Sequence, residues 1–144
     1  MKRIIATVAL LVSIAFIAKA DERPIEVNSM PKAAVEFINS HFAQVPVLLA
    51  TGDRELMDTD YEVRLEDGTK IDFDGKGRWV EVSNKRVGVP ASVIPKSVAT
   101  YLAEKYPTAK CLSIERNRHS YEVNLTNGLE LIFSLEGKLI GFDD

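Results

Sequence analysis

The same sequence motif occurs twice in this chain, sixty positions apart and without a gap. The first copy starts at Tyr61 and reads Tyr-Glu-Val-Arg-Leu-Glu-Asp-Gly, and the second starts at Tyr121 and reads Tyr-Glu-Val-Asn-Leu-Thr-Asn-Gly. Further apolar residues and a glycine follow each copy at matching offsets: Ile71, Phe73 and Gly77, then Leu131, Phe133 and Gly137. A repeat of this length predicts two copies of one supersecondary unit that share a core.

The first twenty residues have the pattern of an export signal. Lys2 and Arg3 precede an apolar stretch, and the small-x-small sequence Ala18-Lys19-Ala20 follows it. The apolar stretch is shorter than the roughly 20 residues that a membrane-spanning helix needs. We expect residues 1–20 to be a cleaved Sec signal peptide and residues 21–144 to form a periplasmic protein without a membrane span. A retained N-terminal anchor is the alternative.

The charge of the expected mature chain limits its partners. Cleavage would remove three of the 18 basic residues and none of the 21 acidic ones, which leaves 15 against 21 and a net charge of −6. Nucleic-acid binding depends on neutralising phosphates, so this balance argues against a nucleic-acid partner. It also argues against anionic membrane surfaces.

Each copy of the motif is preceded by a segment with helical periodicity. Apolar residues recur at three- and four-residue spacing between Pro31 and Phe42 and again between Pro95 and Tyr106. Proline is favoured at the start of a helix. We therefore expect one short amphipathic helix before each copy.

Four strands are expected after each helix, because apolar and polar residues alternate with a period of two. They cover about 45–51, 59–65, 69–73 and 78–82 in the first copy, and about 110–116, 119–125, 129–133 and 138–142 in the second. A three-residue turn with Gly68 in a left-handed conformation sets Val63 opposite Ile71. The next hairpin is expected to set Phe73 opposite Val80.

These elements predict an α+β fold made of two tandem helix plus four-strand antiparallel repeats, at about 27–82 and 90–142. The strands are expected to form one sheet within a single domain. Both helices would cover one face of this sheet and leave the other face open to solvent, which antiparallel sheets tolerate.

The helix, the motif Tyr-Glu-Val-x-Leu-x-(Asp/Asn)-Gly and the later Phe-x-x-x-Gly, in tandem behind a signal peptide, resemble the PepSY-like periplasmic family of Bacteroidetes. That family is related in fold to the beta-lactamase inhibitory protein. The resemblance covers about residues 27–142. It implies a non-enzymatic exported protein, either an inhibitor or a ligand-binding module, and some relatives carry a calcium-regulated label. It supplies no catalytic residue.

The expected open face carries an acidic patch in the first copy. The register places Asp60 opposite Asp74 and Glu62 opposite Asp72, with Glu81 on the next strand. Opposed like charges destabilise a sheet, and carboxylate oxygens suit a hard cation such as calcium. These five residues are candidate calcium ligands. A solvated acidic surface with basic neighbours is the alternative.

Trp79, Ile132 and Leu139 are expected on the same open face, where exposed aromatic and aliphatic groups can anchor a protein partner. The alternative for Trp79 is a position under a loop or linker. Cys111 is the only cysteine, and its neighbours favour a small buried residue. No nucleophile motif, phosphate loop or dinucleotide fingerprint is present, which argues against an enzyme.

The function predicted from the sequence is therefore a periplasmic module that recognises another protein or a peptide through its open sheet face. The alternative is a calcium-binding or calcium-regulated periplasmic protein that uses the acidic patch.

Overall fold

The computed structural model describes residues 22–55 and 58–143, so the predicted signal peptide lies outside the described residues. The described part of the chain contains two α-helices, α1 (Lys32–His41) and α2 (Lys96–Lys105), and one 3-10 turn, η1 (Val27–Ser29). The strands are β1 (Glu22–Pro24), β2 (Val47–Glu55), β3 (Asp58–Leu65), β4 (Lys70–Phe73), β5 (Trp79–Ser83), β6 (Cys111–Arg116), β7 (Ser120–Leu125), β8 (Glu130–Ser134) and β9 (Leu139–Asp143).

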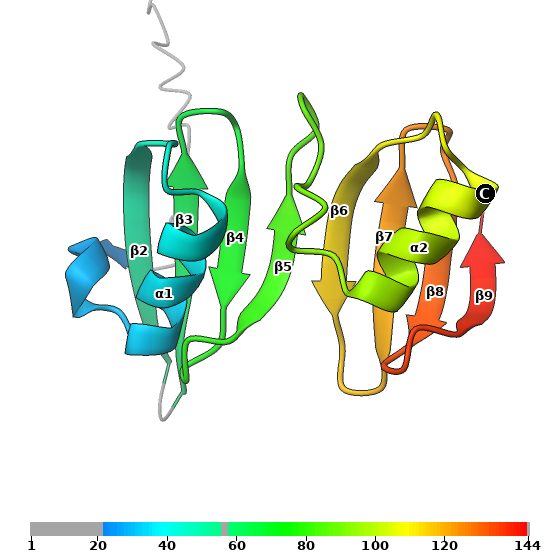
Figure 1. Cartoon of the computed structure of the whole chain (residues 1–144). Coiled ribbons are helices and arrows are strands. Elements are labelled where there is room, and N and C mark those ends of the chain that lie inside the picture. The colour runs from blue at the N-terminus through cyan, green and yellow to red at the C-terminus, as the bar shows by residue number, and fades with distance from the viewer. Residues whose placement is uncertain (1–21, 56–57, 144) are drawn as a thin grey trace, which may run out of the picture.

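The strands form one continuous antiparallel sheet in which each strand pairs with the next along the chain, from β1 to β9 (Figure 1). The predicted architecture of two tandem helix plus four-strand units is therefore wrong. The sheet starts before the first helix, because Glu22–Pro24 pairs with residues 51–53 of β2. It also has no boundary in the middle, because β5 pairs directly with β6. Both pairings satisfy backbone groups that separate units would leave unpaired.

The register of the β3–β4 hairpin agrees with the one predicted from the three-residue turn at Gly68. Val63 pairs with Ile71 and Tyr61 with Phe73, and Gly68 has a φ of 92° in the turn. The β4–β5 pairing differs from the prediction, because Phe73 pairs with Trp79 and not with Val80. A one-residue irregularity between Asp72 and Phe73 accounts for the shift, and extra residues of this kind change which side chains share a face.

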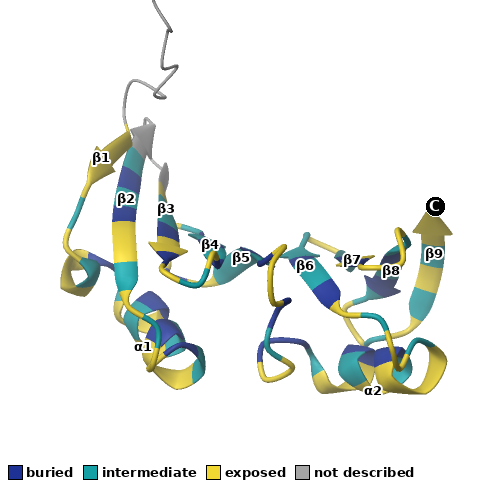
Figure 2. Ribbon diagram, turned by 90° about the horizontal axis from the view of Figure 1, so that it is seen from above, coloured by how far each residue is buried: buried dark blue, intermediate teal, exposed yellow. Residues whose placement is uncertain are grey.

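Both helices lie on the same face of the sheet, and no described element covers the opposite face (Figure 2). The helices occur where the proline-led periodicity predicts them, with Pro31 and Pro95 as N-caps. Ala34 and Ile38 of α1 and Val98 and Leu102 of α2 are buried against the sheet. The fully buried apolar sheet residues are those of the alternating pattern: Val63, Leu65, Ile71, Phe73, Val82, Ile114, Val123, Leu131 and Phe133.

Two glycine turns pack directly against the helix starts. Gly77, in the β4–β5 turn, has a φ of 80°, and a Cβ there would lie 2.8 Å from Pro31 Cβ. Gly137, in the β8–β9 turn, has a φ of 90°, and a Cβ there would overlap the Ser97 hydroxyl. Glycine is needed at both positions because of the positive φ and the close approach of each helix.

The segment between β5 and α2 is attached to the first half of the sheet by Asn84, which is 1% exposed. Its side-chain amide donates to Thr69 Oγ1 at 3.1 Å and to the carbonyl oxygen of Asp67 at 3.2 Å. Its side-chain oxygen accepts hydrogen bonds from the backbone N–H groups of Arg86 and Val87. A single buried amide therefore fixes the turn between β3 and β4 and the start of the connection to α2.

Candidate functional site

The open face carries a row of five carboxylates, one from each strand between β3 and β7. Cross-strand pairing joins them in sequence: Glu62 with Asp72, Asp72 with Glu81, Glu81 with Glu115, and Glu115 with Glu122. Neighbouring strands lie about 4.8 Å apart, so five like charges follow one line across the sheet. We call these five residues the acidic row.

Basic side chains balance one end of the acidic row. Arg64 Nε lies 2.7 Å from Glu62 Oε1, and Lys70 Nζ lies 3.6 Å from both Glu62 Oε2 and Asp72 Oδ2. Among the described residues, the salt bridges within 4 Å reach no other member of the row. The excess of negative charge therefore lies over β5, β6 and β7.

Burial and the crowding of charges shift the pKa values of two members of the acidic row and of Lys70 beside it. Burial raises the pKa of Glu115 above its usual value, and repulsion from Glu122 and Glu81 adds to the rise. Burial also raises the pKa of Asp72, where Lys70 opposes the effect. Burial alone would lower the pKa of Lys70, but the charges of Asp72, Glu62 and Glu81 outweigh it and raise that pKa. The row is thus a surface that favours positive charge.

The five predicted calcium ligands do not form one group. Glu62, Asp72 and Glu81 lie together in the acidic row, whereas Asp60 pairs with Asp53 of β2 and is exposed. Asp74 belongs to the β4–β5 turn, where its carboxylate accepts hydrogen bonds from the backbone N–H groups of Lys76 and Arg78 and from Arg78 Nε. Within residues 22–55 and 58–143, no three acidic, histidine or cysteine side chains are arranged to hold a metal ion.

A depression of about 300 Å³ lies at the β2–β4 end of the acidic row. The residues around it include Thr51, Asp53, Asp60, Glu62, Lys70, Asp72 and Val80. Asp53 Oδ1 is buried there and has no hydrogen-bond partner among the described residues. A buried carboxylate oxygen without a donor is unfavourable, so this atom favours a cation or a donor from outside the described residues.

The structure separates the three predicted partner-binding residues. Ile132 lies on the open face, next to Glu122 at the end of the acidic row. Trp79 and Leu139 instead pack against the core on the helix-covered side, which corrects their predicted placement. The cause is the same irregularity in both hairpins, since Phe73 pairs with Trp79 and Phe133 with Leu139.

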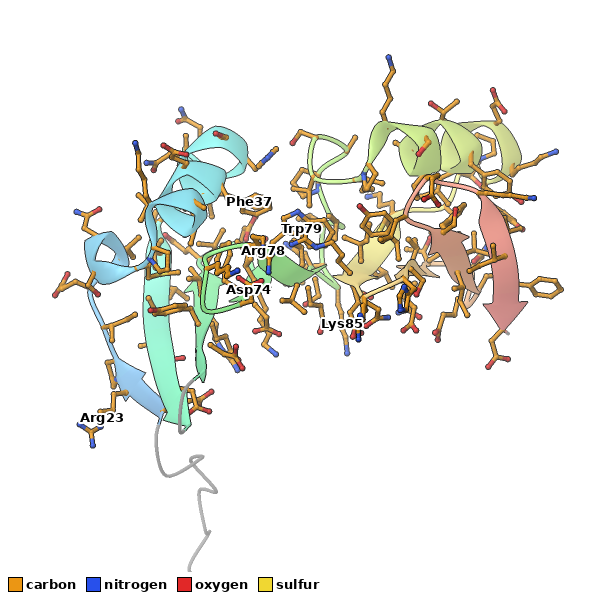
Figure 3. All side chains as sticks on the ribbon, turned by 90° about the horizontal axis from the view of Figure 1, so that it is seen from below. Arg23, Phe37, Asp74, Arg78, Trp79 and Lys85 are labelled. Atoms are coloured by element: carbon orange, nitrogen blue, oxygen red, sulfur yellow. The ribbon has the colours of Figure 1, made fainter. Side chains whose placement is uncertain are left out.

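Trp79 lies between the two helices, beside Phe37 of α1 (Figure 3). Its ring is stacked on Tyr121, with centroids 6.2 Å apart and planes at 22°. The Arg116 guanidinium lies 5.0 Å from the ring centroid and donates a hydrogen bond of 2.7 Å to the Trp79 carbonyl oxygen. Aromatic and cation–π contacts thus hold a half-buried tryptophan in place. Trp79 connects the two halves of the covered face.

Glu115 and Glu122 are the two members of the acidic row that the sequence analysis does not assign to a site. The missing information was the pairing of Glu81 with Glu115 across the β5–β6 junction. The alternation of Ile114 and Glu115 within β6 indicates that Glu115 faces solvent, but it does not place Glu115 beside the first copy of the motif.

The cysteine and the two histidines lie in different elements of the described chain. Burial raises the pKa of the Cys111 thiol to about 12, and the thiol donates to the Ser113 carbonyl oxygen. His41 Nδ1 lies 2.9 Å from Ser92 Oγ and connects α1 to the segment before α2. His119 is exposed between β6 and β7. Across the described chain, neither helix has the length and apolar character required to cross a bilayer.

Comparison with protein families matches residues 59–141 to the beta-lactamase-inhibitor-like, PepSY-like family. This segment starts in β3 and ends in β9, so it includes all five members of the acidic row. No functionally curated protein matches the sequence.

Three solved structures from Bacteroides resemble the chain closely. A periplasmic protein from Bacteroides vulgatus is 41% identical, with a TM-score of 0.81, over 87% of this chain and 98% of that one. A protein from Bacteroides thetaiotaomicron, whose name describes it as calcium-regulated and periplasmic, is 41% identical, with a TM-score of 0.81, over 85% and 97% of the two chains. A second periplasmic protein of Bacteroides vulgatus, of unknown function, is 37% identical, with a TM-score of 0.78, over 85% and 99%.

Proposed function

Because the chain belongs to the beta-lactamase-inhibitor-like, PepSY-like family, we propose that it is a non-enzymatic periplasmic module that binds a basic segment of another protein or peptide. The acidic row is the observation that carries this proposal. The proposed binding surface consists of Glu81, Glu115 and Glu122, with Ile132 as an apolar neighbour at its end.

The arrangement of the row supports a binding role. Directly opposed like charges destabilise a sheet, and here four successive strand pairs oppose carboxylates on a face that needs no charge to fold. A partner rich in lysine or arginine would relieve this repulsion and would be guided to the surface by its charge. The absence of cover from either helix leaves the face accessible to a partner of considerable size.

The export pattern in residues 1–20 and the names of the similar Bacteroides proteins support the proposed periplasmic location. Mass spectrometry of the N-terminus of the protein recovered from the periplasm tests it. We expect a chain that begins near Asp21. A chain that retains Met1 in the membrane fraction would contradict this location.

Capture from periplasmic extract tests the binding surface. We compare the wild-type protein with the triple variant Glu81→Gln, Glu115→Gln, Glu122→Gln, which removes three charges with little change of shape. The matched control is Glu36→Gln, Glu104→Gln, Glu136→Gln, which removes three charges from exposed positions outside the row.

We expect proteins captured by the wild type to be retained by the control and lost by the row variant. Capture should also weaken as salt is added, because exposed charges are screened over about 10 Å at 0.1 M ionic strength. Equal capture by both triple variants would show that the acidic row is not the binding surface.

Calcium binding is the second candidate, and the buried oxygen of Asp53 is the observation that favours it. The acidic groups of the described residues do not converge on one point, so binding would require Asp53 and Asp60 to turn toward each other. Calcium accepts six to eight oxygen ligands in flexible geometry, whereas magnesium requires a strict octahedron. Calcium should therefore bind more readily than magnesium at this depression.

Thermal unfolding in calcium and in magnesium tests the second candidate. A ligand that binds only the folded protein at one hundred times its Kd stabilises it by about 2.7 kcal/mol. We expect calcium to raise the Tm of the wild type and of Glu36→Gln, and to have no effect on Asp53→Asn, Asp72→Asn. Titration calorimetry without saturable heat at millimolar calcium would exclude this function.

A further inference from the structure

The two edges of the sheet differ in how well they are protected. The β1 edge is three residues long, with charged side chains at Glu22 and Arg23 and a proline, Pro24, that cannot donate a hydrogen bond. Short length, charge and proline are features by which edge strands avoid further pairing. The β9 edge is the five-residue sequence Leu-Ile-Gly-Phe-Asp and lacks proline and positive charge.

Large apolar side chains are exposed along the β9 edge. Phe142 is 70% exposed and Ile140 is 59% exposed. Phe142 is the most exposed large hydrophobic residue in the described part of the chain. An apolar edge strand is a template for another strand, and the only protective feature within β9 is the one-residue irregularity at Ile140.

The equivalent strand in the first half of the molecule already accepts a partner. Phe142 occurs sixty positions after Val82 of β5, and the two hairpins share the same irregularity. Val82 pairs with Ile114 of β6, and both residues are 0% exposed. The same strand geometry therefore receives a neighbour at β5, whereas β9 has none on its outer side among the described residues, which leaves Phe142 exposed.

The charges around β9 favour a second copy of the chain. The acidic row ends at Glu122, and the next two positions of that line are Ile132 and Gly141. Two copies joined at β9 would thus meet across uncharged residues on the open face. Lys138 precedes β9 and Asp143 ends it. Antiparallel pairing would therefore bring Lys138 of one copy toward Asp143 of the other.

We propose that β9 pairs with β9 of a second copy of this chain, antiparallel and about a two-fold axis at Gly141. In this arrangement Ile140 of each copy lies opposite Phe142 of the other, so both exposed apolar residues become covered. A two-fold contact of this kind is closed and does not extend into fibres. The interface adjoins the proposed surface for a basic partner at Ile132 but includes none of its three glutamates.

The interface consists of one strand from each copy, so it buries less surface area than the roughly 1,600 Å² of a standard stable complex. We therefore expect a weak dimer whose population depends on concentration. Sedimentation of the purified protein from micromolar to millimolar concentration should show the average mass rising toward twice the monomer. Phe142→Lys should remain monomeric throughout. Leu48→Lys is the matched control, because Leu48 is 67% exposed on β2, and it should associate like the wild type.

A disulfide across the axis tests the register directly. A Cβ at Gly141 would have its nearest neighbour at 3.6 Å, the Ile132 Cδ1 atom, so Gly141→Cys fits without distortion. Residues directly opposed in antiparallel strands have Cα atoms about 4.5–5.5 Å apart, within the range of disulfides. Under mild oxidation Gly141→Cys should form a covalent dimer several times faster than Phe142→Cys. The buried Cys111 should not contribute.

If Phe142→Lys associates as the wild type does, or if Leu48→Lys alone fails to associate, the interface lies elsewhere. A protein that stays monomeric at millimolar concentration would overturn the proposal. So would equal cross-linking of Gly141→Cys and Phe142→Cys, because the two-fold axis at Gly141 brings only position 141 directly opposite itself. Circular dichroism of each variant confirms that the fold is retained.

Discussion

The two faces of the sheet are built from alternate residues of the same strands, yet they differ in what determines them. On the covered face, positions sixty residues apart have the same character, as with Phe73 and Phe133, or Ile71 and Leu131. On the open face Glu62 and Glu122 agree, but other positions diverge: Asp72 corresponds to Ile132, and Glu81 to Gly141. Folding requires the first set to be apolar, whereas nothing in the fold requires carboxylates in the second.

This difference separates stability from binding. The covered face contains the core and the helices, so substitutions there should act on the free energy of unfolding. The open face contains charges that repel one another, so substitutions there should act on partner binding and on the response to pH. Each of the following predictions contrasts the two faces or tests a contact that belongs to one of them.

The largest effect is expected from a charge placed on the covered face. Val123 is 0% exposed, and Val123→Asp would bury a carboxylate without a partner. We expect a loss of more than about 4 kcal/mol in the free energy of unfolding. Asn124→Asp is the matched control, because it adds the same group to the same strand on the open face. It should cost less than about 1 kcal/mol. Denaturant unfolding measures both, and similar losses would remove the distinction between the faces.

Truncation of Trp79 is expected to have the next largest effect. Trp79→Ala removes the stacking on Tyr121, the contact with Phe37 and the contact with Arg116. We expect a loss of about 3 kcal/mol. Capture of proteins from periplasmic extract should remain unchanged.

Leu48→Ala is the control for Trp79→Ala, since it removes an exposed apolar side chain and should leave the Tm nearly unchanged. A Trp79→Ala variant with a normal Tm and no capture would assign Trp79 to binding. The covered face would then take part in recognition.

The turns that contact the helices should be more sensitive than turns that do not. Gly137 and Gly128 have almost the same φ, 90° and 87°, but a Cβ at Gly128 meets no atom within 4 Å. Gly128→Ala should cost about 1 kcal/mol, from backbone strain alone. Gly137→Ala should cost about 1–3 kcal/mol more, because the new methyl group overlaps Ser97 of α2. Thermal unfolding measures the difference between the variants.

Adding Ser97→Gly to Gly137→Ala should recover part of the loss, and the double-mutant cycle measures the coupling. Without such recovery, the sensitivity of this turn would not come from its contact with α2.

The sequence predicts the covered face well because the features that determine this face involve residues close together in the chain. The alternation of Tyr61, Val63 and Leu65, together with the length of the glycine turn, predicts the β3–β4 register, and the structure confirms it. The prolines at 31 and 95 mark both helix starts. Hydrophobic periodicity is enough for these features, because each depends on residues fewer than about 20 positions apart.

The open face is less predictable because it depends on contacts between distant segments and on irregular pairing. One extra residue in the β4–β5 hairpin moved Trp79 to the opposite side from the one predicted. The pairing of β5 with β6 spans the segment that contains α2, and it places Glu115 beside Glu81. Strand β1 has no alternating pattern in its three residues, so the sequence did not predict it.

The smallest effect is expected from the acidic row and depends on pH. Burial and repulsion from Glu122 and Glu81 raise the pKa of Glu115 in the folded protein above its usual value of 4.5. The folded state therefore holds a proton at pH values where the unfolded state has lost it, and stability falls as the pH rises through the folded pKa. Glu115→Gln removes this loss, so at neutral pH the variant should be more stable than the wild type, by less than about 1 kcal/mol because solvent screens the row. The advantage should disappear as the pH falls below 4.5, where the carboxyl is protonated in both states.

Glu136→Gln, at an exposed position in the β8–β9 turn, is the control and should follow the wild type in thermal melts across this range. A Glu115→Gln variant that is less stable than the wild type at neutral pH would mean that the charge of Glu115 contributes to the fold.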